Sequence, residues 1–356
     1  MGKSLSFGLL ILVSVASAHL LAQVRDGGKV PNEAPVAEVK VALLGDTGAG
    51  PMFGSVLGLV VAERADIVMI NGDLGYGSAP VVWKERLLSA IDVEAFAVIG
   101  SLGNHDVENN NASAYVTAFA DFRNDRNGLK RKCTGTTGIT QGRDIVAVDE
   151  VCTFGNLSIV VSGIGQVLSV PYLEEKFEDK LKSVPAGNWK LAGYHYTLTS
   201  MNPGIKSNQN TFKFFDLIRQ HGAIGAQAHT HTVMASCPIS SAFALDAAVL
   251  CHPEFGSDLE NRFVAPGTGL FVDSSLSGRE ARVRGRCKNP TDSSCAHMVD
   301  IISKEGYTRA DGVKKAGFNT FGAMFIVFNV GGDPTKAQAY FKSVDGQVVF
   351  KFNITR

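Results

Sequence analysis

The sequence has no surplus of charge of either sign, because 34 lysine and arginine residues balance 34 aspartate and glutamate residues. A protein that binds an extended stretch of nucleic acid needs a basic surface to neutralise the phosphates. The balanced composition therefore argues against a nucleic-acid partner.

A long apolar run is missing from the sequence after residue 18. A membrane-spanning helix needs about 20 predominantly apolar residues. The nearest candidate, residues 321–330, has the length of a strand and is followed by the turn sequence Gly331-Gly332-Asp333-Pro334. We expect this segment to be a core strand that ends in a turn, and we expect no stable association with a membrane.

Residues 1–18 have the pattern of a secretory signal peptide. Lys3 supplies a positive charge, residues 7–16 are apolar, and Ala16-Ser17-Ala18 is a small-residue cleavage site. The alternative is a signal anchor, but the apolar run is shorter than the about 20 residues that span a bilayer. We therefore predict cleavage before His19 and export, either to the secreted state or to an endomembrane or lysosome-like lumen.

The sequence contains no C-x-x-C pair, the spacing typical of a structural zinc site. Its six cysteines are an even number in a chain predicted to be exported, so three disulfides are expected. In a eukaryotic host, the N-x-S/T sequences at Asn111, Asn156 and Asn353 would also accept glycans. The cysteine spacing favours pairing between neighbours, namely Cys133 with Cys152, Cys237 with Cys251, and Cys287 with Cys295.

Apolar runs alternate with amphipathic stretches through the first half of the chain, which is typical of an α/β protein. The pattern predicts strands at residues 39–44, 67–70 and 96–99, and helices at 53–64 and 81–91. Further strands are expected near 159–161, 189–192 and 223–226, with a helix near 212–221. Each of the first three strands ends in a glycine-containing turn with polar residues, where open α/β sheets bind their ligands. We therefore expect these turns to converge.

Five short polar motifs carry the residues best suited to chemistry. Alone, each is weak, because Gly-Asp-x-Gly is a common turn and a single tyrosine or histidine is more often a core residue. The motifs are Gly45-Asp46-Thr47-Gly48, Gly72-Asp73-Leu74-Gly75-Tyr76, Gly103-Asn104-His105-Asp106, Gly193-Tyr194-His195-Tyr196 and His229-Thr230-His231. Their order along the chain resembles that of a two-metal centre that hydrolyses phosphoesters.

This ordered set resembles the purple acid phosphatases, a branch of the calcineurin-like metallophosphoesterases. Many metallophosphoesterases begin with Asp-x-His, whereas this chain has Asp46-Thr47-Gly48. The purple acid phosphatase pattern replaces that histidine by a tyrosine three residues after the second aspartate, where Tyr76 stands. The resemblance implies an α/β fold, a four-layer α/β/β/α sandwich of two mixed sheets that closes with a pair of strands. It would form one catalytic domain over residues 39–356, after an extension at 19–38.

The resemblance also implies which side chains bind each metal. The first site would hold Fe³⁺, whose charge ionises a bound phenol, and the second would hold Fe²⁺, Zn²⁺ or Mn²⁺. His105 would contact the substrate phosphate or transfer a proton, and Asp106 could orient it. The implied ligands are Asp46, Asp73, Tyr76 and His231 for the first metal and Asp73, Asn104, His195 and His229 for the second, with Asp73 as the bridge.

The local sequence supports this division. Alternate residues of a strand face the same side, so His229 and His231 are expected to project together from a strand.

Two features depart from the family pattern. Ala228 stands where a glycine usually precedes the H-x-H pair, and residues 196–210 lack the histidines that act on the leaving group. Proton donation would then fall to His105, to Tyr196 or to a metal-bound water.

Together these features predict a secreted, monomeric acid phosphatase that hydrolyses small phosphate monoesters by attack of a metal-bound hydroxide. Two alternatives stay open. One is a secreted metallophosphodiesterase, which differs in substrate preference. The other is a weakly active binding protein that retains the metal site, an alternative motivated by Ala228 and by the missing histidines.

Overall fold

All described helices and strands lie within Ala37–Arg356, the larger of two units into which the chain divides. The predictions for the signal peptide and for the pairs Cys237–Cys251 and Cys287–Cys295 lie outside the described residues. The computed structural model describes residues 36–108, 111–122, 131–134, 139–141, 144–147, 149–163, 170–198, 212–231, 233–236, 238–241, 261–274, 307–308, 314–315 and 321–356.

The first sheet has seven strands in the order β12-β18-β17-β16-β1-β2-β3. Its parallel strands β1 (Val39–Leu44), β2 (Ile67–Asn71) and β3 (Ala97–Ser101) are almost completely buried. Burial on both faces explains why these strands are continuous apolar runs. The sheet is extended by β16 (Gly322–Phe328), β17 (Lys336–Ser343) and β18 (Val348–Thr355), which pair antiparallel, and by the edge strand β12 (Asn261–Phe263).

The C-terminal region differs in one respect from the expected closing pair of strands. β16 forms the predicted core strand and ends at the short 3₁₀ turn η4 (Val330–Gly332), as expected from the glycines. The chain then adds a hairpin of two strands, β17 and β18, so three strands close the sheet.

The second sheet also has seven strands, in the order β11-β13-β10-β9-β8-β7-β4. Cys133 and Cys152 lie opposite each other on two of its strands and form a disulfide, which confirms the pairing predicted from their spacing. The parallel strands are β8 (Leu157–Val161), β9 (Trp189–Gly193), β10 (Ile224–Gln227) and β13 (Leu270–Ser274). The antiparallel ones are β4 (Arg131–Thr134), β7 (Glu150–Phe154) and β11 (Val233–Ala235).

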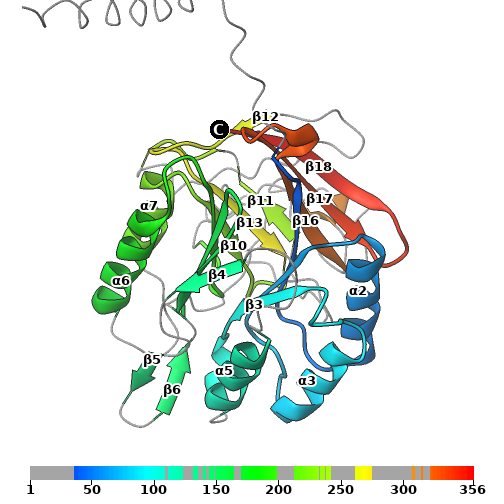
Figure 1. The fold of residues 1–356 in the computed structure, drawn as a ribbon. Helices are drawn as coiled ribbons and strands as arrows, with labels where there is room; N and C mark the ends of the chain where they lie inside the picture. Colours follow the sequence, from blue (N-terminus) through cyan, green and yellow to red (C-terminus); the bar gives the residue numbers. More distant parts are fainter. Residues whose placement is uncertain are drawn as a thin grey trace, which may run out of the picture. The chain divides into compact units, whose positions relative to one another are not determined.

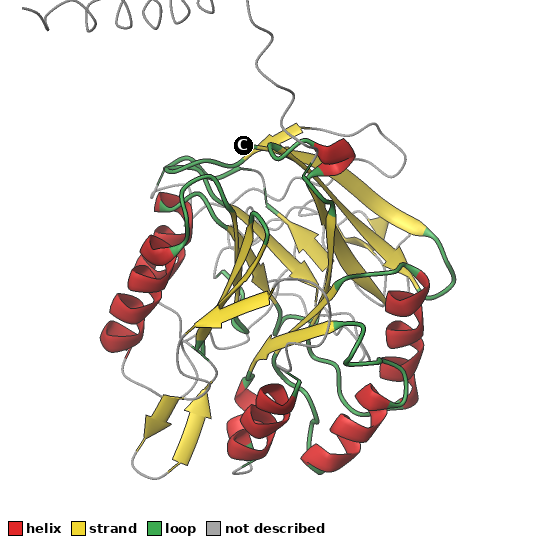
Figure 2. Ribbon diagram, viewed as in Figure 1, coloured by secondary structure: helices red, strands yellow, loops and turns green. Residues whose placement is uncertain are grey.

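Helices cover the outer faces of the two sheets (Figure 1). α2 (Pro51–Ala62), α3 (Pro80–Leu88) and α5 (Ala112–Asp121) lie beside the first sheet, and α6 (Val170–Ser183) and α7 (Phe212–Gln220) beside the second. Figure 2 shows the sheets stacked between these helices. The arrangement confirms the predicted α/β sandwich of two mixed sheets. Short pairs are formed by β5 (Ile139–Gln141) with β6 (Asp144–Ala147) and by β14 (Tyr307–Thr308) with β15 (Lys314–Lys315).

Two apolar clusters stabilise these layers. The larger fills the space between the sheets and continues under α2 and α3, where Trp83 is fully buried. The smaller joins α6 and α7 to the second sheet through Phe177 and Phe214, whose ring centroids lie 4.5 Å apart. Within the described ranges, no helix has the length and apolar character required to cross a membrane.

The side chains of Asn156 and Asn329 form a reciprocal amide pair that joins the two sheets. Each Nδ2 donates to the other residue's Oδ1 at 2.8 Å, and Asn329 is fully buried. Asn156 is one of the three predicted glycan acceptors. A glycan would replace one of the two hydrogens on its Nδ2, so the pair could persist only through the remaining hydrogen.

Candidate metal centre

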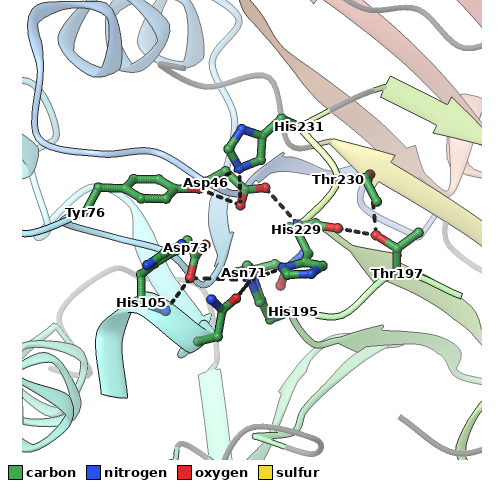
Figure 3. Close-up of polar contacts among 12 residues, drawn as sticks. Asp46, Asn71, Asp73, Tyr76, His105, His195, Thr197, His229, Thr230 and His231 are labelled. Carbon is green, nitrogen blue, oxygen red and sulfur yellow. Dashed lines mark hydrogen bonds and ion pairs between the residues drawn. The ribbon is translucent and has the colours of Figure 1, made fainter. Parts of the chain in front are cut away.

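Every predicted metal ligand lies just beyond the carboxyl end of a parallel strand. Asp46 follows β1, Asp73 and Tyr76 follow β2, and Asn104 begins the short helix α4 (Asn104–Glu108) after β3. On the second sheet His195 follows β9, and His229 and His231 follow β10. Because parallel strands end at a common edge, motifs far apart in sequence meet there (Figure 3).

Asp46, Tyr76 and His231 form the first group of side chains. The Tyr76 hydroxyl donates to Asp46 Oδ1 at 2.8 Å and lies 2.8 Å from His231 Nε2. His231 Nε2 also lies 3.2 Å from Asp46 Oδ1. Ligand atoms of Asp46, Asp73 and His231 all lie within 4.8 Å of one another, close enough to hold one ion.

The second group is centred on His195, which is fully buried. Its Nε2 lies 3.2 Å from Asn104 Oδ1, 3.2 Å from His229 Nδ1 and 3.4 Å from Asp73 Oδ1. Asp73, His195 and His229 again offer ligand atoms within 4.8 Å of one another. Asp73 therefore belongs to both groups, as a bridging carboxylate must.

The environment of Asp73 fits a bound cation. Its side chain is fully buried, and its Oδ1 accepts the backbone N–H of His105 at 3.0 Å. Among the described residues, no hydrogen-bond donor reaches its Oδ2. A buried carboxylate oxygen without a donor is costly, so a metal ion in contact with Oδ2 would remove a large penalty. The carboxylate, imidazole, phenol and amide groups present are all common metal ligands.

The pKa shifts in the site also fit a bound cation. Burial lowers the pKa of His195, but the neighbouring Asp73 carboxylate outweighs burial and raises that pKa to about 9. Burial and the Asp46 carboxylate raise the pKa of the Tyr76 phenol well above its usual value. The carboxylates therefore favour the protonated forms of both His195 and Tyr76. A bound cation reverses this preference and favours the phenolate and the neutral imidazole.

The backbone around the ligands is strained. Five of the predicted ligands have a positive φ, which non-glycine residues rarely adopt and which costs about 1–3 kcal/mol per residue in sparsely populated regions. Gly72 has a φ of 79° and lies so close to Gly103 that a side chain at either position would overlap the neighbouring turn. The five ligands are Asp46 (φ 51°), Asp73 (φ 53°), Tyr76 (φ 47°), His229 (φ 75°) and His231 (φ 57°).

The H-x-H segment is not the strand that its spacing predicted. β10 ends at Gln227, and residues 228–231 form a turn in which both histidines have positive φ. The His229 N–H donates to Asp46 Oδ2 at 2.8 Å, which draws the backbone into the site. The two imidazoles still contact different ligand groups, His231 the first and His229 the second. Their directions are set by the turn, however, and not by the alternation of side chains along a strand.

Two buried residues position the ligands in ways that the sequence analysis did not predict. Asn71 was assigned no role there, and Asp106 was assigned a different one. The backbone carbonyl of Asn71 accepts a hydrogen bond from His195 Nδ1 at 2.7 Å, which directs Nε2 toward the site. Asp106 was expected to orient His105, but its carboxylate has other partners. Its carboxylate accepts N–H groups of Leu74 at 2.8 Å and Gly103 at 2.7 Å, so it joins two ligand-bearing turns. Burial and nearby Asp73 raise the pKa of Asp106 to about 7.

His105 and Tyr196 were both candidates for proton donation, and the structure separates them. The His105 side chain is 39% exposed, and its Nε2 lies 4.0 Å from Asp73 Oδ2. Tyr196 is 2% exposed, and its ring packs edge-on against His229, with centroids 4.6 Å apart. Only His105 of this pair is placed to meet a substrate from solvent.

Ala228, the departure from the family's usual glycine, is accommodated by a glycine on the other side of the contact. Its buried methyl group packs against the Cα of Gly45, where any side chain would overlap it. Ala228 therefore fits before the H-x-H pair because Gly45, in the first motif, has no side chain to occupy the same space.

The comparison with protein families agrees with this geometry. The model of the calcineurin-like phosphoesterases matches residues 39–233, which is more than half of the chain. The chain belongs to the calcineurin-like phosphoesterases. Members of this family hydrolyse phosphoesters. The matched residues contain every predicted ligand. A comparison with curated protein sequences finds no match.

A solved structure supports the fold of this phosphoesterase. The purple acid phosphatase PPD1 from seeds of yellow lupin (Lupinus luteus) is similar, with a TM-score of 0.58 and 16% sequence identity. The similarity covers 90% of this chain and 54% of the lupin protein. PhoD is similar over 91% of this chain and 69% of its own, with 12% identity and a TM-score of 0.48. At 16% identity, the likeness to the lupin protein shows the fold alone.

The contact between Gly45 and Ala228 yields a test of the packing at the site. We expect Gly45→Ala to lower the free energy of unfolding by about 1–3 kcal/mol, because it overpacks a filled space. Combining it with Ala228→Gly should restore most of the loss, because the methyl group is then only moved. Denaturant unfolding of both variants measures the difference. Equal stability of the single and double variants would show that the two positions do not compete for space.

Proposed function

We propose that this phosphoesterase is a purple acid phosphatase-like enzyme, which hydrolyses small phosphate monoesters at a dinuclear metal centre. The observation that carries this proposal is the position of Tyr76. Its hydroxyl lies 2.8 Å from both Asp46 Oδ1 and His231 Nε2, within the first ligand group. At Gly48, where the Asp-x-His pattern has its histidine, an added Cβ would lie 3.7 Å from the Tyr76 ring. Tyr76 therefore takes the space and the ligand role of that histidine.

We infer Fe³⁺ for the first group, because the oxygens of two carboxylates and one phenol suit a trivalent ion. The second group offers two imidazoles and an amide oxygen beside Asp73, which suits Fe²⁺, Zn²⁺ or Mn²⁺. When bound, such a metal pair supplies an activated water nucleophile and neutralises charge on the phosphoryl oxygens. The protein's own residues hold the ligands in place and manage the protons.

His105 is the residue we assign to the substrate. Its backbone N–H is bonded to Asp73 Oδ1, which fixes the residue beside the bridging carboxylate. Its ring is partly exposed, so it can meet a phosphate oxygen or a leaving oxygen that enters from solvent, and an imidazole can donate or accept the proton there. Tyr196, packed against His229, instead supports a metal ligand.

We also propose that the protein is exported and acts as a monomer in an oxidising compartment. The pattern of residues 1–18 and the disulfide between Cys133 and Cys152 support export, because structural disulfides persist mainly in such compartments. The catalytic domain would then be residues 39–356, preceded by an extension at 19–38.

Substrate preference tests the proposed function directly. We expect the purified, metal-loaded protein to hydrolyse an activated aryl phosphate monoester faster than the corresponding bis-aryl diester, assayed side by side. A strong preference for the diester would instead identify a phosphodiesterase. Full metal content without hydrolysis of either compound over a broad pH range would indicate a binding protein.

Two substitutions separate metal binding from proton transfer. We expect Asp73→Asn to lose metal, because it removes a negative charge that both ions share. We expect His105→Ala to retain both ions and to lower kcat by about 10²–10⁴-fold, the usual contribution of a general acid or base. Elemental analysis and steady-state kinetics measure the two effects. Unchanged metal content and activity in Asp73→Asn would remove Asp73 from the site.

The Tyr76 assignment has a spectroscopic test. If the phenolate binds Fe³⁺, oxidised protein with confirmed iron content should show a broad visible absorption band. Tyr76→Phe should abolish this band while leaving the ring packing nearly unchanged. A band that survives in the iron-containing variant would show that the phenolate is not an iron ligand, and the purple acid phosphatase assignment would fail with it.

A further inference from the structure

His229 occupies one of the least favourable backbone conformations in the site. Its φ is 75°, and the carbonyl of Ala228 accepts the N–H of Thr230 at 2.9 Å. This hydrogen bond between residues two apart defines a γ-turn, and γ-turns with a positive central φ are rare and strained. Strain of this kind costs about 1–3 kcal/mol and persists only where the surroundings hold it.

The strained turn lets His229 contact both ligand groups. Its backbone N–H donates to Asp46 Oδ2 in the first group at 2.8 Å, and its Nδ1 lies 3.2 Å from His195 Nε2 in the second. Relaxation of His229 to a negative φ would rotate its N–H and its side chain relative to each other. One of the two contacts would then be lost.

Three buried side chains hold the turn from the side opposite Asp46. Thr197, just after β9, donates its hydroxyl to the Ala228 carbonyl, the acceptor of the γ-turn. Thr230, at the other end of the turn, donates its hydroxyl to Asp273 Oδ2 at 2.8 Å. The same carboxylate oxygen lies 2.9 Å from the Thr197 hydroxyl. We call Thr197, Thr230 and Asp273 the clamp.

The chemistry of the clamp suits this task. Asp273 lies in β13 and is fully buried, as is Thr197, and Thr230 is 5% exposed. The hydrogen bond from the Thr230 hydroxyl to this buried carboxylate is stronger than one between neutral groups. Figure 3 shows Thr197 and Thr230 on one side of His229 and Asp46 on the other. The turn is thus held from both sides, between β13 and the first ligand group.

We propose that the clamp is a positioning device for the second metal site, and that Asp273 is its central residue. It fixes both ends of the γ-turn so that the His229 imidazole faces His195 and Asp73. The proposal rests on the proposed function only in requiring that two metal ions bind. The clamp residues are not among the predicted ligands, so we expect their effect to pass through the ligand that the γ-turn carries, His229.

Thr230→Val and Thr230→Ser make a matched test. Valine keeps the shape of threonine but cannot donate to Asp273, whereas serine keeps the hydroxyl. Mn²⁺ binding to the full chain is measured by equilibrium dialysis with elemental analysis. We expect Thr230→Val to bind the first ion normally and the second about 10–100-fold more weakly, the usual effect of losing a group that orients a ligand. Thr230→Ser should bind both ions as the wild type does.

Thr153→Val is the control for a general loss of stability. It removes a partly buried hydroxyl that bonds Ser158 at 3.1 Å on the β7–β8 side of the same sheet. We expect it to bind two ions normally. Asp273→Asn is the second test, because it keeps the shape of the clamp and removes the charge. It should weaken the second ion selectively, even if Thr230→Val does not fold.

The outcomes separate this proposal from the proposed function. Normal binding of both ions by Thr230→Val and Asp273→Asn would overturn the clamp, as would an equal loss in Thr153→Val. A wild-type protein that binds only one ion would overturn it as well. If the wild type binds two ions but hydrolyses no phosphate ester, while Thr230→Val loses the second ion, the proposed function fails and the clamp stands.

Discussion

The charge of Asp73, fully buried between two groups of ligands, is the feature on which the site depends. One of its oxygens accepts the His105 N–H, and the other has no donor among the described residues. This charge raises the pKa of the neighbouring His195 against the opposing effect of burial. Two cations that share this carboxylate would satisfy it more completely. The surrounding imidazoles, phenol and amide can be understood as the remaining ligands of those cations.

Such a site requires a backbone that ordinary secondary structure cannot provide. Five ligands adopt positive φ, and their strain is offset by buried carboxylates outside the ligand set. Asp106 joins the turns that carry Asp73 and Asn104 by accepting two backbone N–H groups. Asp273 has the corresponding role for the H-x-H turn, because it accepts the Thr230 hydroxyl at one end of that turn. In both cases a charge outside the metal centre holds the conformation of a ligand.

The fold places these turns where they can cooperate. The parallel strands of both sheets end on the same side, so short turns after five strands meet without long loops. The first sheet carries Asp46, Asp73, Tyr76 and Asn104, and the second carries the three histidines. Each metal group therefore contains ligands from both sheets. Relative movement of the sheets would disturb both groups at once, and the apolar cluster between the sheets resists such movement.

The sequence by itself determined the strands of the first half, the Cys133–Cys152 pair and the set of ligand candidates. These depend on local periodicity, on spacing and on residue types that few structural roles require together. The sequence did not reveal that His229 lies in a γ-turn, that the carbonyl of Asn71 orients His195, or that Asp106 and Asp273 hold the turns. Those features depend on hydrogen bonds between segments up to 183 residues apart, as between Asp46 and His229. Only tertiary structure brings such donors and acceptors together, so no local pattern records them.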